Sequence, residues 1–598
     1  RHLAYYRRRA QGGTGAIVVK SLFVDPVGKE HPKQLGVSSY GHVDGLSRLT
    51  AAIRDGGAVS IAHLNHAGRA ANPKATGTTP VAPSVVPCPT TGASPAALTK
   101  DEIKRIVYGF VGAAGRAVES GFDMIELQFG MGYLIHQFIS PRTNHRSDAY
   151  GGSDENRVRF GREVLEGITN TIGGRIPVIA RISATETGDA AELPETIKLA
   201  RELEEMGAAA LHVGSGSACD SPPFYYQHMR LPETLNLDWA AEIKKHVAIP
   251  VIVAGRMGDP ARMREALSDA RVDAIALGRP LVADPDIPLK MEQGQDEDIY
   301  RCGACLQGCL MGVKAGGGLS CIINPEVGRE DELLRRVEHP ARVVIVGGGP
   351  AGMQAAITAQ SRGHQVTLFD KGDLGGQFNL AVLPPGKAEM NKPLESMIRR
   401  TRKSGVELRL GRRVSAEEIA RERPEHVILA TGSTPNLAAV AGLETAFSSG
   451  DILLGEIKVG KRVLVIGGGM VGLETAEYLT EKGHSVTVVE ILDQVAADME
   501  PVTAKLLLKN LQQNGVRVLT GTTLTRFDHQ TAYVQGQDGE QALGDYDTVV
   551  SSIGSAPMDS LEQHLLEQGI AVYRIGDAKR PGSIASAIND GFNIARNI

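Results

Sequence analysis

Four of the chain's six cysteines lie in one short, glycine-rich segment with the spacing C-x2-C-x3-C-x11-C. They are Cys302, Cys305, Cys309 and Cys321. Thiolates are soft ligands, and a set of four selects zinc or an iron–sulfur cluster. Structural zinc sites usually have two C-x2-C pairs well apart in the sequence, which this segment lacks. The spacing therefore predicts a [4Fe–4S] cluster, with structural zinc and ordinary buried cysteines as the alternatives.

A dinucleotide-binding pattern follows the cysteines. It consists of a strand, a G-x-G-x-x-G turn, a helix and a second strand that ends in an acid. The glycines are Gly347, Gly349 and Gly352, and the acid is Asp370. In this arrangement the N-terminus of the helix faces a pyrophosphate, and the acid accepts hydrogen bonds from ribose hydroxyls. We therefore expect a dinucleotide site here.

The same pattern occurs a second time, with Gly467, Gly469, Gly472 and the acid Glu490. Two patterns predict two dinucleotides, or a duplicated fold in which one site is inactive. Strand-like segments at 427–433 and 549–555 bracket the second pattern. We therefore expect the second domain to be inserted in the first. Residues 341–450 and 549–598 would form one domain, and residues 451–548 the other.

The N-terminal half of the chain alternates β-branched runs with amphipathic helical patterns, which is typical of repeated βα units. Seven strands are expected, at 16–19, 59–64, 123–128, 178–182, 209–213, 251–254 and 274–277. A (β/α)8 barrel needs eight. We expect the first strand to precede Arg1, within roughly 35–45 further residues, the size of one βα unit. Residues 1–295 would form the barrel, and residues 296–340 the cysteine segment and a linker.

In barrels of this class, phosphate is held by the loops after the seventh and eighth strands. These loops offer Gly255 with Arg256, and Gly278 with Arg279. Glycine allows close backbone approach and arginine supplies charge, so the pairs predict a phosphate-bearing cofactor, with ordinary turns as the alternative. Arg181, at the end of the fourth visible strand, would bring another cation to the same mouth or serve as a structural salt-bridge partner.

Candidate proton donors lie in the loops that follow the strands. Tyr133 and His136 follow the third visible strand, and His66 and His228 lie in other loops. A phenol can protonate a developing carbanion or enolate. Taken alone, each of these side chains is more often structural than catalytic.

Composition narrows the class of protein. A hydrophobic content of 42% and a net charge of −5 describe an ordinary globular protein, with no reason to expect nucleic acid or an anionic membrane as partner. No run of 18 apolar residues is present. Clustered cysteines favour a reducing compartment. We therefore expect a cytoplasmic protein in which the two remaining cysteines, Cys88 and Cys219, are inert buried thiols.

The order of barrel, cysteine segment and paired dinucleotide domains resembles the 2,4-dienoyl-CoA reductase, enoate reductase and trimethylamine dehydrogenase family, whose barrel is related to old yellow enzyme. The resemblance covers essentially the whole chain. It implies FMN in the barrel, a [4Fe–4S] cluster, FAD in the first dinucleotide domain and NADH, or less favourably NADPH, in the second.

The resemblance also assigns roles to individual residues. It implies that His63 and Arg181 contact the flavin of FMN, and that Tyr133 is a proton donor. Its implied FMN phosphate residues are Gly255, Arg256, Gly278 and Arg279. Its implied FAD residues are Gly347, Gly349, Gly352, Asp370, Gln377, Gly576 and Asp577. Related barrels often have two histidines that grip a substrate carbonyl, where this chain has Gln128 and Met131.

The implied activity is reduction of an activated C=C bond in a small enoyl-CoA, dienoyl-CoA or enoate. Electrons would pass from NADH to FAD, then to the cluster, to FMN and to the substrate. Tyr133 would protonate the substrate, with His136 or His228 as relay. Glu490 would favour NADH because a 2′-phosphate would meet its charge. The alternatives are an oxidative amine dehydrogenase, which needs no NADH, and a scaffold protein with decayed sites.

Overall fold

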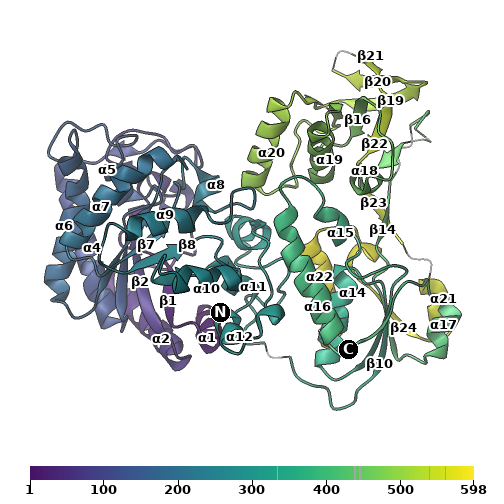
Figure 1. The fold of residues 1–598 in the computed structure, drawn as a ribbon, viewed down its shortest axis with the longest axis horizontal. Helices are drawn as coiled ribbons and strands as arrows, with labels where there is room; N and C mark the ends of the chain where they lie inside the picture. The colour runs from purple at the N-terminus through teal and green to yellow at the C-terminus, as the bar shows by residue number, and fades with distance from the viewer. Residues whose placement is uncertain (333, 437–439, 444–445, 538, 559–560) are drawn as a thin grey trace. The chain divides into compact units, whose positions relative to one another are not determined.

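The computed structural model describes residues 1–332, 334–436, 440–443, 446–537, 539–558 and 561–598 (Figure 1). The backbone divides into two compact units. The first contains residues 1–299 and 329–331, and the second contains residues 300–328 and 332–598. None of the helices in the described ranges is both long and apolar enough to cross a membrane.

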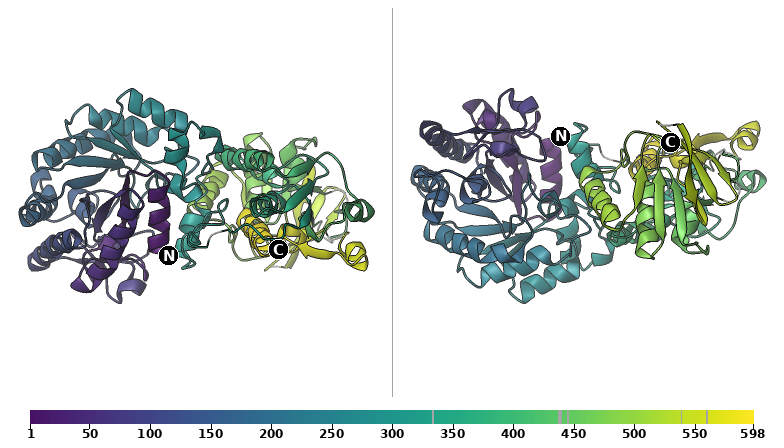
Figure 2. Two further views of the ribbon diagram at one scale, coloured as in Figure 1. Left: turned by 90° about the horizontal axis from the view of Figure 1, so that it is seen from below. Right: turned by 90° about the horizontal axis from the view of Figure 1, so that it is seen from above.

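Seven parallel strands form the centre of the first unit, and each pairs with its neighbours in chain order. They are β1 (Ala16–Phe23), β2 (Val59–Asn65), β5 (Met124–Gln128), β6 (Val178–Ser183), β7 (Ala210–Gly214), β8 (Val251–Ala254) and β9 (Ala274–Ala276). The seven expected strands are thus confirmed. The sheet curls on itself, and helices lie on its outer side (Figure 2). This is the strand order of a (β/α) barrel.

The helices α2 (Val43–Asp55), α4 (Lys100–Glu119), α6 (Asp154–Ile172), α7 (Leu193–Glu205), α9 (Leu235–Lys244) and α10 (Pro260–Ser268) follow successive strands. The start of α4 agrees with the sequence. Thr99 and Glu102 form a capping box, in which each side chain accepts a hydrogen bond from the other residue's backbone N–H.

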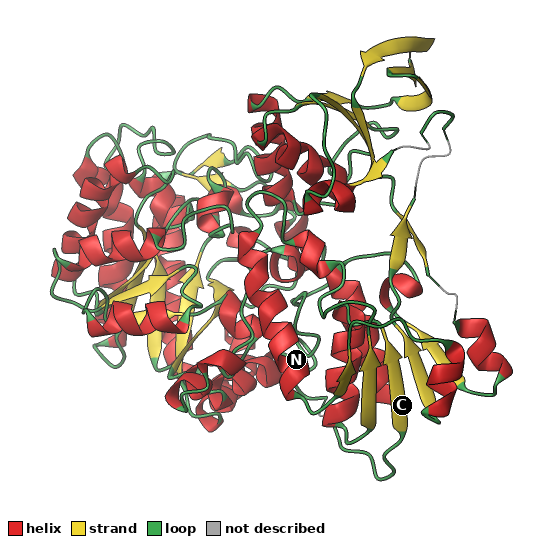
Figure 3. Cartoon of the chain, turned by 45° about the vertical axis from the view of Figure 1, so that its right-hand side comes forward, coloured by secondary structure: helices red, strands yellow, loops and turns green. Residues whose placement is uncertain are grey.

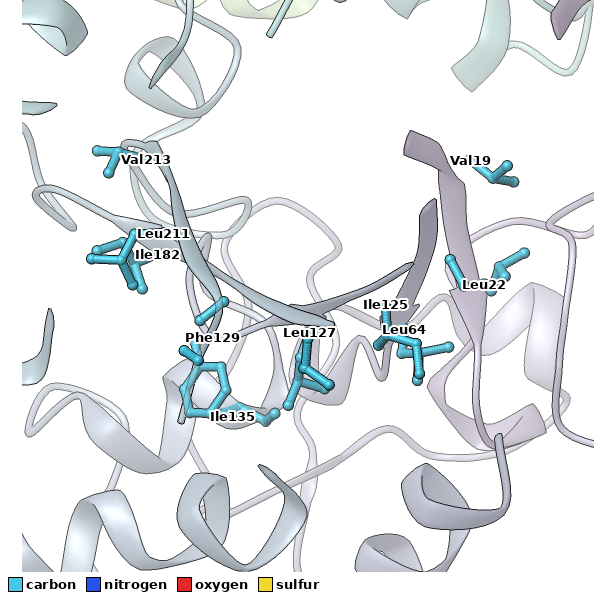
Figure 4. Close-up of a cluster of buried hydrophobic side chains, with 14 of the residues drawn as sticks. Val19, Leu22, Leu64, Ile125, Leu127, Phe129, Ile135, Ile182, Leu211 and Val213 are labelled. Atoms are coloured by element: carbon cyan, nitrogen blue, oxygen red, sulfur yellow. The ribbon is translucent and has the colours of Figure 1, made fainter. Parts of the chain in front are cut away.

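The alternation of side chains along each strand separates two cores. Outward-facing residues such as Leu64, Leu127 and Leu211 are fully buried in the layer between strands and helices (Figure 4). Inward-facing residues such as Ile61, Ile179 and Ala210 form a smaller apolar cluster inside the barrel. Because side chains alternate with a period of two, the next inward positions along the strands lie above that cluster, toward the C-terminal ends. Those positions are polar.

The second unit contains two five-stranded parallel sheets (Figure 3). The first has the order β12-β11-β10-β13-β24, with β12 (Glu407–Arg409), β11 (Gln365–Phe369), β10 (Arg342–Val346), β13 (His426–Leu429) and β24 (Ala571–Arg574). The second has the order β15-β22-β16-β17-β18, with β15 (Phe447–Ser448), β22 (Thr548–Ser551), β16 (Arg462–Ile466), β17 (Ser485–Val489) and β18 (Arg517–Leu519). The second sheet thus comes between β13 and β24 in the sequence.

The pairing of β22 differs from the expected division of the chain. We placed residues from 549 onward in the first dinucleotide domain, but β22 pairs with β16 in the second sheet. The chain passes back only afterward, where β23 (Ser555–Pro557) pairs with β14 (Ser433–Pro435). The segment V-V-S-S-I-G-S at 549–555 resembles V-I-L-A-T-G-S at 427–433, which suggested that both belong to the first domain. In the structure, the first residues of the later segment pair in the second sheet, and only its end returns toward the first domain.

Candidate active site

A carboxylate between two histidines forms the polar layer inside the barrel. Glu126 on β5 is fully buried. Nδ1 of His63, on β2, lies 2.5 Å from one of its oxygens, and Nδ1 of His212, on β7, contacts the other. Arg181 on β6 places Nη1 3.6 Å from the same carboxylate. Four consecutive strands of the sheet therefore bring these side chains together, because each residue occupies an inward position.

The protonation of this layer follows from its contacts. Burial raises the pKa of Glu126, but the charge and hydrogen bonds of His212 and His63 outweigh burial and hold it well below its usual range. Burial lowers the pKa of His212. Glu126 is therefore an anion that accepts a hydrogen bond from Nδ1 of each histidine. In the neutral form that burial favours for His212, its Nε2 is an acceptor.

Several buried polar atoms of the described residues lack a hydrogen-bond partner and lie at the C-terminal end of the barrel, and their types indicate which ligand groups could bind there. Within the described residues, these buried atoms have no hydrogen-bond partner: Arg181 Nε, Arg279 Nη1, His212 Nε2 and Gln227 Oε1. Buried polar atoms are normally paired. The set contains both donors and acceptors, as a flavin ring with its imide and phosphate requires. These residues fit FMN.

The two glycine–arginine loops differ in what their arginines contact. Arg279 donates to the backbone carbonyl of Gln227 (2.9 Å). The buried guanidinium of Arg256 donates to the carbonyl of Met229 (3.1 Å) and lies 3.3 Å from Glu233. Arg279 thus retains a donor for a phosphate, whereas Arg256 is largely engaged with its own loop.

The glycines of these loops also differ. Gly255 has φ +121°, and a Cβ there would lie 2.5 Å from Nδ2 of Asn236, so glycine is required. Gly278 precedes α11 (Arg279–Ala283) and has no such neighbour within 4 Å. Of the two, only Gly255 is enforced by packing.

Tyr133 lies at the start of α5 (Leu134–Ile139) and is 4% exposed. Its hydroxyl donates to Glu30 (2.7 Å) and lies 2.6 Å from the hydroxyl of Tyr225. Burial, with the charges of Glu30 and Tyr225, raises the pKa of Tyr133 well above its usual range. Tyr133 is therefore a neutral phenol that holds its proton.

The two candidate relay histidines have other neighbours. Nδ1 of His136 accepts from the backbone N–H of Gly132 (3.1 Å). His228 is fully buried, and burial together with Arg230, Arg279 and Arg256 lowers its pKa to about 4. It is thus a neutral imidazole beside the arginines of the phosphate loops. Nδ1 of His66 accepts from Gly68 N–H (3.0 Å), and burial lowers its pKa to about 4.

The positions that depart from related barrels have structural contacts. Gln128 Oε1 accepts from Gly130 N–H (3.2 Å), and its Nε2 lies 3.4 Å from Nε2 of His63. Met131 packs with Tyr133 in a small apolar cluster.

Sequence reasoning missed Glu30, Glu126 and His212. For Glu126 and His212 a signal existed, because each is a polar residue at an alternate position of an otherwise apolar strand.

The four clustered cysteines lie in the second unit, and none of them is in a disulfide. Burial raises the pKa of Cys321 to about 12, and burial with the nearby Cys302 and Cys309 raises that of Cys305 further. Backbone N–H groups of Gln307, Ile323 and Asn324 are directed at sulfur. No three His, Cys, Asp or Glu side chains among the described residues converge on one point as a single metal ion requires. Four thiols of one segment are the type of donor that an iron–sulfur cluster takes, with one thiolate to each iron.

The two remaining cysteines are not free thiols. Cys88 and Cys219 form a disulfide between residues 131 positions apart, with Cα atoms 5.1 Å apart. The expectation of two inert thiols is therefore wrong. Two isolated cysteines 131 positions apart show no spacing that would reveal their proximity, so no sign of the bond is visible in the sequence.

The first dinucleotide turn has the geometry that its glycines suggest. Gly347 has φ +112°, and a Cβ on Gly352 would lie 1.8 Å from the carbonyl oxygen of Gly347. Gly349 caps α14 (Pro350–Ser361). Asp370 accepts from Gly348 N–H (2.5 Å) and Gly372 N–H (2.7 Å).

Two of the remaining expected FAD residues, Gln377 and Asp577, contact the hydroxyl of Ser433. Gln377 donates to the hydroxyl of Ser433 (3.1 Å), which in turn donates to Asp577 (3.2 Å). Gly576 has φ +57°. Ser433, which the sequence reasoning did not single out, thus joins residues from the two separate parts of this domain.

The second dinucleotide turn repeats this geometry. Gly467 has φ +104°, a Cβ on Gly472 would lie 1.9 Å from its carbonyl oxygen, and Gly469 caps α19 (Met470–Glu481). Glu490 is 8% exposed and accepts from Gly468 N–H (2.6 Å) and Leu492 N–H (2.9 Å). Both of its oxygens therefore hold the turn, and each retains a lone pair for a ribose hydroxyl.

Comparison with known proteins finds two family matches along the chain. Residues 1–298 match the NADH:flavin oxidoreductase / NADH oxidase family, and residues 341–584 match the pyridine nucleotide-disulphide oxidoreductase family. The chain is 40% identical to an NADH oxidase of Thermoanaerobacter brockii and 33% identical to a cinnamate reductase of Clostridium sporogenes. Each alignment covers 100% of this chain and 94% of the relative.

A solved structure extends the likeness to the fold. A 2-naphthoyl-CoA reductase in complex with 2-naphthoyl-CoA superposes with a TM-score of 0.94 at 28% identity, covering 100% of this chain and 94% of the other. The expected barrel and dinucleotide folds are thereby confirmed, as are sites for flavin and a nicotinamide cofactor. The chain is a flavoprotein oxidoreductase of the NADH:flavin oxidoreductase / NADH oxidase family, in the group that contains 2,4-dienoyl-CoA reductase and trimethylamine dehydrogenase.

Proposed function

We propose that the chain is a cytoplasmic, NADH-dependent reductase of an activated C=C bond in a small enoate or enoyl-CoA. The observation that carries this proposal is the buried, neutral phenol of Tyr133, in the loop that follows β5, the strand that carries Glu126. A reductase of this kind needs a proton donor beside its flavin site. The names of two relatives, cinnamate reductase and 2-naphthoyl-CoA reductase, describe such reactions.

Residues of the barrel would bind FMN and orient it. His212 would accept a hydrogen bond from the flavin imide, Arg181 would donate to the ring, and Arg279 would bind the phosphate. His63 and Gln227 would complete the polar contacts. Reduced FMN supplies a hydride when bound. Tyr133 then protonates the neighbouring carbon of the substrate, so that one hydride and one proton saturate the double bond.

Residues of the second unit would bind the other electron carriers. The four clustered cysteines would hold a [4Fe–4S] cluster. The turn from Gly347 to Gly352 would bind FAD, and the turn from Gly467 to Gly472 would bind NADH. These groups supply electrons in the order NADH, FAD, cluster and FMN.

Anaerobic rapid mixing tests the proposal. Enzyme reduced with NADH is mixed with trans-cinnamate, cinnamoyl-CoA or 2-naphthoyl-CoA, oxidised enzyme is mixed with dimethylamine, and flavin absorbance is followed in each case. Reoxidation by an unsaturated acid or thioester, lost in Tyr133→Phe while reduction by NADH is unchanged, is the expected result. Failure of NADH to reduce the flavins, together with flavin reduction by dimethylamine, would instead establish an amine dehydrogenase.

A further inference from the structure

Three loops of the barrel bring Glu30, Tyr133 and Tyr225 together. Glu30 follows β1, Tyr133 follows β5, and Tyr225 ends α8 (Pro222–Tyr225), which follows β7. The Tyr133 hydroxyl is the central group, 2.7 Å from Oε1 of Glu30 and 2.6 Å from the hydroxyl of Tyr225. Glu30 and Tyr133 are 103 positions apart in the sequence. The contact therefore depends on the curl of the sheet.

The loop that carries Glu30 is held from several sides. Gln34 Oε1 accepts from the backbone N–H of Glu30 (2.7 Å), and Lys29 and Gly28 accept at their carbonyls from Asn72 and Ala67 N–H (3.0 Å each). A Cβ on Gly28 would lie 2.6 Å from the His66 ring. These contacts fix the carboxyl of Glu30 against Tyr133.

The surroundings of Glu30 favour its neutral form. Burial raises the pKa of its carboxyl, and the hydrogen bond from Tyr133 opposes that rise only in part. The other titratable groups at this cluster are Tyr225 and Tyr226, together with Arg181, whose charge acts on Tyr225. Burial raises the pKa of Tyr225 to about 12. The pKa of Glu30 therefore lies above that of an ordinary carboxyl group, while the phenols of Tyr133 and Tyr225 hold their protons more firmly than ordinary phenols do.

We propose that Glu30 is the proton reservoir that resupplies Tyr133, and that it acts through Tyr133 as a positioning residue. This inference rests on the proposed C=C reduction. Neither Gln128 nor Met131 has a titratable proton to give, and His136 and His228 have the other neighbours described above. Glu30 is the carboxyl group in contact with the Tyr133 oxygen.

The proton balance is simple. Once a hydride has been added to one alkene carbon, the other carries the electron pair and takes the proton of Tyr133. The O–H bond of Tyr133 breaks and a C–H bond forms. The Tyr133 oxygen then takes the carboxyl proton of Glu30, which becomes a carboxylate and is reprotonated by water before the next turnover.

The test compares Glu30→Gln with the wild-type holoenzyme. Glutamine keeps the volume and can accept the Tyr133 hydrogen bond, but it has no proton to give. With whichever of trans-cinnamate, cinnamoyl-CoA or 2-naphthoyl-CoA reoxidises the wild type, the rate constant at saturating substrate is expected to fall about tenfold to a hundredfold. The concentration for half-saturation should change less than about threefold.

The pH profile separates proton supply from a structural role. Only the neutral carboxyl donates, so the wild-type rate should fall as pH rises through the raised pKa of Glu30. That alkaline fall should vanish in Glu30→Gln and persist in Glu30→Asp. Glu119→Gln, a change at an exposed glutamate of α4, is the control. A wild-type-shaped profile in Glu30→Gln would overturn the proposal.

A spectroscopic arm does not depend on the substrate. Infrared difference spectra of the holoenzyme between acid and alkaline pH should show a protonated-carboxyl band that persists to higher pH than that of a solvent-exposed acid. The band should be absent in Glu30→Gln and present in Glu119→Gln. If no substrate reoxidises the wild type, the proposed function fails. If the band is unchanged in Glu30→Gln, the assignment of Glu30 fails.

Discussion

The carboxylate of Asp498 accepts hydrogen bonds from the backbone N–H of Met470, at 2.9 and 3.2 Å. Met470 is the first residue of α19, directly after the glycine turn. In a dinucleotide site, the amides at this helix end bind the pyrophosphate. Asp498 therefore holds a donor that NADH would use, and its charge lies where the pyrophosphate charge would lie.

Asp498→Ala should accordingly tighten NADH binding. Removal of one competing carboxylate is expected to lower the NADH concentration for half-maximal FAD reduction by about threefold to tenfold, about 0.7–1.4 kcal/mol. Rapid mixing of oxidised enzyme with NADH measures it. Asp493→Ala removes the same charge from the same exposed loop and is the control. Weaker binding in Asp498→Ala would mean that Asp498 supports the loop and does not compete.

Glu126→Gln should weaken FMN binding selectively. The amide of glutamine would place a donor N–H₂ against Nδ1–H of one histidine, so that hydrogen bond would be lost. The neutral amide would also leave Arg181 without its counter-charge. Removal of one member of a buried ion pair destabilises a protein by about 3–5 kcal/mol. The purified variant is expected to lose FMN on gel filtration and to keep FAD, which chromatography of the released flavins would show. Equal loss of both flavins would contradict this local role.

The cysteine segment makes a compositional prediction. The purified protein should contain about four iron and four acid-labile sulfide atoms per chain, with negligible zinc. Cys305→Ala should lose the cluster and stop FMN reduction by NADH, while FAD is still reduced. Cys88→Ala, outside the segment, should keep its iron. Wild-type FMN reduction in Cys305→Ala would rule out the cluster as carrier.

The disulfide links the two loops around 88 and 219. Cys219 adjoins Asp220, which forms an ion pair with the buried Arg69 and accepts from the hydroxyl of Ser217 (2.8 Å). The bond therefore restrains the loop that leads to Tyr225. Six cysteines less the bonded pair leave four thiols. Cluster-free, unreduced protein should show that number on thiol titration in denaturant, and six would contradict the bond.

Much of the fold could be predicted because its signals are local. The strands of the barrel are buried on both faces, so β-branched runs mark each one. The two glycine turns could also be recognised from the sequence. Only glycine is possible at Gly352 and Gly472, because a Cβ there would collide with the preceding turn. Local pattern and local structure coincide at these positions.

The parts of the site that were missed depend on long-range contacts. Glu30 meets Tyr133, and Cys88 meets Cys219, across more than 100 positions of sequence. Nothing in either neighbourhood specifies the partner, since the curl of the sheet and the paths of the loops determine it. Asp498 similarly reaches Met470 only through the fold of the loop after β17.

The last prediction concerns the choice of nicotinamide. Glu490 follows β17, where a carboxylate would accept from the adenosine ribose and repel a 2′-phosphate. Arg526, a cation from a distant loop, lies with its guanidinium 3.3 Å from the centre of the Tyr533 ring and its Nη1 3.7 Å from Asp528. Because its guanidinium is engaged in these two contacts, we do not expect Arg526 to bind a 2′-phosphate. NADH should therefore exceed NADPH by at least about tenfold in kcat/KM, about 1.4 kcal/mol. Steady-state FAD reduction with each nucleotide measures the ratio, and equal efficiencies would show that Glu490 does not select against the phosphate.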